Sequence, residues 1–262
     1  MAESSHSGKI VSAVPEIAAS GKLYVVGMGP GSLDGMTKEA FKAIGDCQVI
    51  AGYTVYADLV KPYFPDKEYL TTPMTKEEAR CRMAFECCME GKDTAMICSG
   101  DSGVYGMAGL MYEVGVNYPE TELEIIPGVT AATGGAAVLG APLIHDFCLI
   151  SLSDLLTPWE KIEARLLAAA QADFVVCLYN PSSKKRHDYL QKACDLMMKY
   201  KSPDTICGTV SNIARDGEEA HVMTLKELRD TQVDMFTTVF IGNSQTKEIN
   251  NKMVTPRGYR NV

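Results

Sequence analysis

Short apolar runs rich in β-branched residues alternate with helical patterns along almost the whole of this 262-residue chain. That alternation is typical of α/β architecture with largely parallel strand pairing, because parallel strands need a long crossover connection, usually a helix. The length allows two modest domains or one large one. The expected strands are residues 22–27, 47–52, 94–98, 122–126, 147–151, 173–179, 205–210, 219–223 and 236–242.

The beginnings of three helices are marked by a threonine followed three residues later by a glutamate, which is the pattern of a capping box. The three pairs are Thr75 with Glu78, Thr157 with Glu160, and Thr224 with Glu227. Pro158 follows the second threonine and fits the first position of a helix, where its missing amide hydrogen costs nothing.

The regular pattern breaks at "LGAPLIHD", residues 139–146, where glycine and proline follow a helix of small residues. Such residues interrupt regular structure, so we place a domain boundary there. The chain then divides into a loosely ordered segment over residues 1–20, a first α/β domain over 21–142 that carries the glycine-rich loops, and a second α/β domain over 143–262.

The composition narrows the possible partners. No apolar run approaches the roughly 18 residues needed to span a bilayer, and the first 20 residues lack a secretory signal, so we expect a cytoplasmic protein with no membrane partner. The formal net charge of -8 disfavours a nucleic-acid partner, which requires a basic face. The nine cysteines form no Cys-x-x-Cys pair, which indicates reduced thiols and no metal site.

The first expected strand runs into a loop with several glycines, in the sequence "YVVGMGPGSLDGMT". A dinucleotide-binding turn would need Gly-x-Gly-x-x-Gly with free amides for a pyrophosphate, and a ribose-binding carboxylate about 20 residues later. Pro30 has no amide hydrogen, Ser32 replaces the third glycine, and the second strand, "CQVIAGY", ends without a carboxylate. The loop therefore predicts a bent wall for a ligand and not a pyrophosphate cradle.

Two more expected strands of the first half end in glycine-rich loops, "SGDSGVYGMAG" at residues 99–109 and "PGVTAATGG" at residues 127–135. Ligands of open parallel sheets bind at the carboxyl ends of the strands, and glycine there lets the backbone approach a ligand closely. Each loop alone is better explained as a tight βα turn, since such turns commonly use glycine. Their matching placement favours a binding site, with the carboxylate of Asp101 in the richest loop.

The loops "VGMGPGSLDGMT", "SGDSGVYG" and "PGVTAA" resemble the signatures of the tetrapyrrole methylase family, the class III methyltransferases that use S-adenosylmethionine. The resemblance covers about residues 21–260. Residues 140–186 and "TTVFIGNSQT" are similar in particular to the branch that methylates C17 of precorrin-3B or cobalt-factor III. Ser102 stands where the family motif usually has proline, a variant that still resembles this branch.

This resemblance implies two αβα domains with the methyl donor in the cleft between them, a homodimer, and C17 methylation with ring contraction to (cobalt-)precorrin-4 in cobalamin biosynthesis. Because S-adenosylmethionine contains no phosphate, Pro30 is no obstacle to its binding. Carried over position by position, the resemblance implies ten residues that contact the donor. They are Pro30, Ser99, Gly100, Asp101, Val104, Thr130, Ala131, Tyr179, Asn180 and Ala214.

A precorrin carries many acetate and propionate groups, so an acidic protein must gather local positive charge to bind one. For residues 184–186 the alternative is a solvated helix start, and for the arginine of "ARDGEE" it is a surface pair with a neighbouring glutamate. The residues that we expect to contact acceptor carboxylates are Lys184, Arg186, Arg215 and Arg257.

Methyl transfer from a sulfonium to carbon is an in-line displacement in which proximity does most of the work. The ring contraction also moves protons, and the candidate acids or bases are Asp101, His145 and Asp146. Each of them alone is more typical of a structural role, and His145 in particular of a satisfied core histidine.

Two other classes stay open: a methyltransferase of the same fold that acts on RNA or protein, and an NAD(P)-dependent oxidoreductase. The first predicts a broad basic face, which the charge of -8 disfavours, and the second a pyrophosphate cradle. The nine cysteines and 14 methionines are compatible with an anaerobic host and favour a cobalt-containing acceptor, but the sequence does not decide whether the macrocycle carries cobalt.

Overall fold

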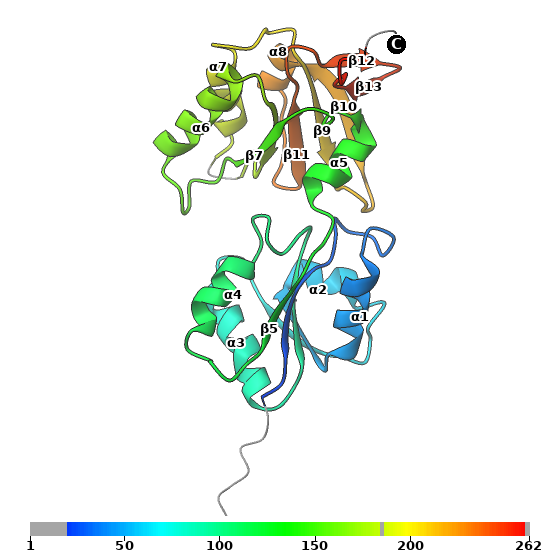
Figure 1. Cartoon of the computed structure of the whole chain (residues 1–262), viewed down its shortest axis with the longest axis vertical. Coiled ribbons are helices and arrows are strands. Elements are labelled where there is room, and N and C mark those ends of the chain that lie inside the picture. The colour runs from blue at the N-terminus through cyan, green and yellow to red at the C-terminus, as the bar shows by residue number, and fades with distance from the viewer. Residues whose placement is uncertain (1–19, 184–185, 260–262) are drawn as a thin grey trace, which may run out of the picture.

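Two five-stranded sheets, each with helices on both faces, form two domains that lie one above the other in Figure 1. The computed structural model describes residues 20–183 and 186–259. The expected loose segment over residues 1–20 therefore lies, except for its last residue, outside the described part of the chain. Within that part, every helix is too short or too polar to cross a membrane.

The first sheet is entirely parallel, in the order β3-β2-β4-β1-β5. Its strands are β1 (Leu23–Gly27), β2 (Val49–Tyr53), β3 (Glu68–Thr72), β4 (Thr94–Cys98) and β5 (Leu123–Ile126). The helices between them are α1 (Lys38–Asp46), α2 (Thr54–Val60), α3 (Glu77–Met89) and α4 (Ala108–Gly115). All five carboxyl ends of these strands therefore lie along one edge of the sheet.

Strand β1 shows why this sheet is covered on both faces. Leu23 and Val25 belong to the core cluster that includes α3 and α4, whereas Val26 belongs to the cluster on α1 and α2. Successive side chains of a strand point to opposite faces, so a continuous apolar run is typical of a strand buried between two layers of helices.

The second sheet is mixed, in the order β10-β9-β11-β8-β7. Its strands are β7 (Phe147–Ser151), β8 (Val175–Tyr179), β9 (Ile206–Ser211), β10 (Glu219–Thr224) and β11 (Thr237–Ile241). Only β7 and β8 pair in parallel, and the other three neighbouring pairs are antiparallel. The expectation of largely parallel pairing is therefore wrong for this domain, since a short loop after β9 reverses the chain into β10 without a helical crossover.

Helices also cover both faces of the second sheet. The core on one face includes α6 (Trp159–Gln171), α7 (Tyr189–Met197) and α8 (Leu225–Arg229). On the other face lie α5 (Ala131–Leu139) and Met253 of a small sheet. The strands of that small sheet are β6 (Gly140–Ala141), β12 (Lys247–Ile249) and β13 (Lys252–Val254).

Helix α5 bears on where the two domains meet. Its buried residues Ala132, Ala136 and Leu139 pack with β8, β9 and β11 of the second sheet, although α5 precedes residue 143 in the chain. We therefore propose a boundary in residues 127–130, between β5 and α5, rather than at 142/143. The segment that joins the domains in Figure 1 is then the same glycine-rich loop that follows β5.

One of the three expected capping boxes is present. Thr224 accepts a hydrogen bond from the Glu227 amide at 3.3 Å, and the Glu227 carboxylate accepts one from the Thr224 amide at 2.8 Å. Helix α6 has Pro158 as its N-cap and α3 has Lys76, in both cases without a side-chain capping bond. The other two boxes are therefore absent, and Pro158 lies one position earlier than expected.

Replacing Thr224 by alanine is expected to lower the free energy of unfolding by about 0.5 to 2 kcal/mol, because the Glu227 amide at the start of α8 loses its acceptor and the Glu227 carboxylate loses the hydroxyl donor. The matched control is Thr157→Ala, which removes a threonine of the same sequence pattern that makes no cap and is expected to change stability by less than about 0.5 kcal/mol. Urea denaturation measures both, and equal losses would contradict the assignment of the cap.

Candidate functional site

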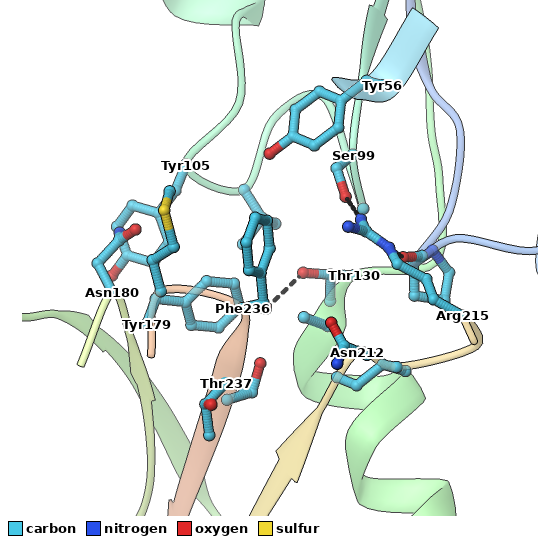
Figure 2. Close-up of a pocket in the computed structure, with 17 residues that line it drawn as sticks. Tyr56, Ser99, Tyr105, Thr130, Tyr179, Asn180, Asn212, Arg215, Phe236 and Thr237 are labelled. Carbon is cyan, nitrogen blue, oxygen red and sulfur yellow. Dashed lines mark hydrogen bonds between the residues drawn. The ribbon is translucent and has the colours of Figure 1, made fainter. Parts of the chain in front are cut away.

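A cavity of about 180 Å³ lies between the domains, at the carboxyl ends of the strands of the first sheet. Residues from both domains and from the connecting loop line it (Figure 2). Eight of the ten expected donor-contacting residues are among them: Pro30, Ser99, Gly100, Val104, Thr130, Ala131, Tyr179 and Asn180. The other two, Asp101 and Ala214, lie beside lining residues without lining the cavity themselves.

Three glycine-rich loops meet beneath the cavity with almost no space between their backbones. Gly29 and Gly100 exchange two backbone hydrogen bonds, of 3.0 and 2.7 Å. A Cβ atom on Gly128 would lie 2.2 Å from the carbonyl oxygen of Gly100 and 2.5 Å from that of Gly27. Only glycine allows these loops to approach so closely, so the sequence at the three strand ends is required by their contact with one another.

Asp101 fixes the position of two of these loops. One carboxylate oxygen accepts a hydrogen bond from the Gly128 amide and the other from the Gly103 amide, each at 2.8 Å. Ser102, the residue that replaces the usual proline, donates its hydroxyl to the carbonyl of Ile126 at 3.2 Å. Both side chains thus join the loop after β4 to the loop after β5, and the structure gives Asp101 a positioning role.

Two tyrosines close the cavity between the domains. The hydroxyl of Tyr179 is hydrogen-bonded to the hydroxyl of Thr130 at 2.6 Å and accepts the amide of Ala132 at 2.8 Å, which fixes the first turn of α5. Burial raises the pKa of Tyr179 above its ordinary value. Tyr105 of the first domain packs at 5.2 Å from the ring of Tyr179 and donates to the carbonyl of Leu149 at 3.0 Å, in the second domain.

Unusual backbone conformations gather around this cavity. Tyr105, Asn180, Asn212 and Ala214 have positive φ angles of 53°, 52°, 49° and 55°. Asparagine tolerates this conformation, but alanine and tyrosine adopt it at a cost of about 1–3 kcal/mol. Strain of this kind persists where the surrounding structure imposes it and is typical of functional sites. The bend at Ala214 directs the next residue, Arg215, toward the first domain.

Arg215 reaches across the cavity from the second domain to the first, as Figure 2 shows. Its Nε donates to the carbonyl of Pro30 and its Nη2 to the hydroxyl of Ser99, both at 2.9 Å. Burial lowers the pKa of the guanidinium. The alternative surface pair with a glutamate is not formed in the described part of the chain, where Glu218 instead accepts the amide of Ala214 at 2.7 Å.

Replacing Gly31 by alanine is expected to dislodge Arg215, because the new Cβ would lie 2.3 Å from Arg215 Cγ and 2.7 Å from its Nε. We expect the affinity for a carboxylate-bearing acceptor to fall about tenfold, with no loss of fold. The control is Gly109→Ala in α4, where a Cβ meets nothing within 4 Å. Equal acceptor affinities for the two variants would show that Arg215 has no part in acceptor binding.

The structure does not bring His145 and Asp146 to the cavity. Both side chains are exposed and precede β7, whose first residue pairs in register with Val175 and whose last pairs with Tyr179. Since Tyr179 lines the cavity, the two residues lie at the opposite edge of the sheet. This placement removes the structural basis for an acid or base role of the pair.

The remaining basic residues are dispersed. Arg186 donates to Ser153 and Asp154, each at 3.1 Å, and is thereby bound to the loop after β7. Arg257 is exposed and follows β13, a strand that Figure 1 shows at the end of the second domain remote from the first. Lys184 lies outside the described residues. Of the three expected acceptor contacts that the structure describes, it thus brings only Arg215 to the cavity.

Sequence reasoning missed Tyr56 and Phe236, which line the cavity with their ring centres 5.9 and 6.0 Å from the guanidinium carbon of Arg215. Tyr56 follows β2, and because no glycine-rich loop comes after this strand, the glycine pattern does not indicate Tyr56. Its position in the sequence does indicate a site residue, because Tyr56 comes directly after the carboxyl end of a parallel strand, where ligands of such sheets bind.

Comparisons with known proteins show the family of the chain. A family model described as Tetrapyrrole (Corrin/Porphyrin) Methylases matches residues 22–229. The cobalt-factor III methyltransferase of Priestia megaterium is 47% identical over 245 residues, 92% of this chain and 45% of that protein. The probable cobalt-factor III C(17)-methyltransferase of Salmonella typhimurium is 46% identical over 238 residues, 90% of this chain and 99% of that protein.

Among solved structures, the crystal structure of the methyltransferase CobJ has a TM-score of 0.84 and 34% identity, covering 90% of this chain and 100% of that one. The chain spans about half the length of the Priestia relative and nearly all of the other two. It belongs to the tetrapyrrole methylase family, whose members are S-adenosylmethionine-dependent methyltransferases. The expected family and the expected two-domain α/β fold are confirmed.

Proposed function

We propose that this chain transfers a methyl group from S-adenosylmethionine to C17 of cobalt-factor III, with the ring contraction that gives cobalt-precorrin-4 when an external reductant supplies two electrons. The observation that carries the proposal is the 46% identity with the Salmonella relative, a probable cobalt-factor III C(17)-methyltransferase, over 99% of that protein. Precorrin-3B is the alternative acceptor. The Priestia relative, which is described as acting on cobalt-factor III, favours the cobalt-containing one.

The cavity fits a methyl donor that has aromatic, polar and charged parts but no phosphate. The rings of Tyr105, Tyr179 and Phe236 supply apolar surface for an adenine, and Ser99 and Thr130 lie where strands end and backbone groups are accessible. Pro30 at the wall presents no amide, which suits this donor and not the pyrophosphate of a dinucleotide. These features support S-adenosylmethionine over NAD(P).

When bound, S-adenosylmethionine supplies an electrophilic methyl group on a sulfonium. The role of the protein is to hold the donor and the acceptor in one orientation. Such positioning can lower the activation free energy by about 7–11 kcal/mol. The closely packed glycine loops and the Asp101 bonds give the cavity a fixed wall. Tyr105 and Tyr179 add two packed rings to this wall, with their centroids 5.2 Å apart.

We also propose that the enzyme acts in the cytoplasm as a homodimer, without a nucleic-acid partner. The net charge of -8 supports the absence of a nucleic-acid partner, and the family resemblance supports the dimer. Size-exclusion chromatography coupled to light scattering tests the assembly, and a monomer at micromolar concentration would contradict it.

The activity is tested by incubating the purified chain anaerobically with S-adenosylmethionine and, separately, cobalt-factor III, precorrin-3B, or ribosomal RNA. We expect S-adenosylhomocysteine to form in step with loss of cobalt-factor III, and the product to gain the mass of one methyl group. If precorrin-3B is turned over and cobalt-factor III is not, the acceptor is the metal-free macrocycle. Methylated RNA without tetrapyrrole turnover would favour the alternative of a macromolecular substrate.

A further inference from the structure

Arg80 is a buried cation without a carboxylate partner. It lies in the first turn of α3 and is only 5% exposed. Its Nε donates to the hydroxyl of Thr72 at 2.8 Å and its Nη2 to the carbonyl of Pro73 at 3.2 Å, both neutral groups. Two residues along the same helix, Arg82 pairs with Glu78 at 2.7 Å on the surface. Arg80 makes no such pair with any residue that the structure describes.

A buried charge without a counter-ion is expensive, and buried charges in proteins are normally paired. The chain has an excess of acidic residues, yet none of those described pairs with Arg80. One guanidinium nitrogen, Nη1, also makes no hydrogen bond there. Because no fully buried side-chain nitrogen or oxygen of the described residues lacks a partner, this atom reaches an accessible surface. Arg80 therefore has an unused donor.

The position of Arg80 is the edge of the first sheet that faces the cavity. Thr72, its partner, is the last residue of β3 and pairs in register with Tyr53, the last residue of β2. The ring of Tyr53 packs edge-on against Tyr56 at 5.2 Å. Tyr56 lines the cavity, and Figure 2 shows its hydroxyl pointing into it. That hydroxyl makes no hydrogen bond with any described residue.

Arg215 lies on another side of the same tyrosine. Its guanidinium carbon is 5.9 Å from the centre of the Tyr56 ring. Like Arg80, Arg215 is bonded to neutral groups and makes no ion pair within the described residues. Burial raises the pKa of Tyr56 above its ordinary value. A tyrosine hydroxyl is both a donor and an acceptor of hydrogen bonds, so this group can donate to a carboxylate.

We propose that Arg80, Tyr56 and Arg215 form a binding site for carboxylate side chains of the acceptor. The three groups offer hydrogen-bond donors and positive charge, and no described carboxylate lies among them to compete. Arg215 lies beside the Tyr56 ring, and Arg80 lies behind it, joined to it through Thr72 and Tyr53. Two guanidinium groups at one edge of the sheet match a macrocycle that presents neighbouring acetate or propionate groups. The inference rests on the proposed function in that the acceptor is a polycarboxylate tetrapyrrole.

The test uses uroporphyrin III, a stable tetrapyrrole with acetate and propionate side chains, and its complete methyl ester, with binding followed by fluorescence. We expect Arg80→Gln to weaken uroporphyrin binding about tenfold or more, equivalent to about 1.4 kcal/mol, and to leave S-adenosylmethionine affinity unchanged. The matched control is Arg82→Gln on the same helix, which removes a surface pair and is expected to change neither affinity by more than about twofold. Equal porphyrin affinities for the two variants would overturn the proposal.

A second measurement keeps the test decisive if Arg80→Gln does not fold. The wild-type chain should bind uroporphyrin more tightly than the ester, with an affinity that falls as salt is added. Ester and acid binding equally well would overturn the site without any variant. The two proposals can fail separately. If Arg80→Gln loses porphyrin binding but the wild-type chain does not methylate cobalt-factor III, the carboxylate site stands and the proposed reaction is rejected.

Discussion

Replacement of Gly128 by alanine is expected to abolish binding of the methyl donor. The added Cβ would lie 2.2 Å from one carbonyl oxygen and 2.5 Å from another, both in backbone that cannot turn aside as a flexible side chain does. The loops after β1, β4 and β5 would have to separate. We expect the donor affinity to fall by about 100-fold or more, equivalent to about 2.7 kcal/mol. Isothermal calorimetry with S-adenosylmethionine measures the effect.

The control for this prediction is Gly109→Ala, since a Cβ there meets nothing within 4 Å. Its donor affinity should equal that of the wild type, and alanine should stabilise α4 by up to about 1 kcal/mol. Full donor affinity in folded Gly128→Ala would show that the close approach of the loops is not needed for binding.

The second large effect is expected for Asp101→Asn. The carboxylate accepts one backbone amide on each oxygen, whereas an asparagine side chain accepts on its oxygen and turns two N–H donors toward the other amide. The Gly128 amide is partly buried, and losing its acceptor costs up to about 1–3 kcal/mol. We expect donor affinity to fall by roughly tenfold to a hundredfold, because the loops after β4 and β5 lose their connection, and not because a proton-transfer group is lost.

Asp46→Asn, which alters an exposed pair with Lys42 at the end of α1, is the matched control and should leave donor affinity unchanged. Kinetics separate the two possible roles of Asp101. A positioning role predicts a raised KM for the donor with a pH profile of kcat like that of the wild type. A shifted pH profile of kcat with an unchanged KM for the donor would indicate that Asp101 acts as an acid or base.

The nine expected strands all appear in the structure, and the edge strand β3 was missed for a physical reason. Its sequence, "EYLTT", is polar and half-exposed because β3 lies at the edge of the first sheet, and the apolar signal of a central strand is absent. The direction of pairing in the second sheet could not be predicted either. It depends on the loop after β9, whose residues do not reveal that β10 turns back beside β9.

In the site, too, local features could be predicted from the sequence and long-range contacts could not. Glycines at the strand ends indicated where the cavity lies, because glycine is the residue that allows backbones to approach closely. The role of Asp101 was not visible, because its partner Gly128 comes 27 positions later. Arg80 did leave a signal in the sequence. It shares a helical stripe with Cys81, Ala84 and Cys88, all buried, so a cation on an apolar face was there to be noticed.

Isotope labelling shows directly whether the chain transfers a methyl group to C17. The chain is incubated with cobalt-factor III and S-adenosylmethionine that carries carbon-13 in its methyl group, and the product is examined by two-dimensional NMR. Our account predicts a single labelled methyl group, bonded to C17 of a contracted ring. A labelled methyl group on any other ring carbon, or on no tetrapyrrole at all, would contradict it.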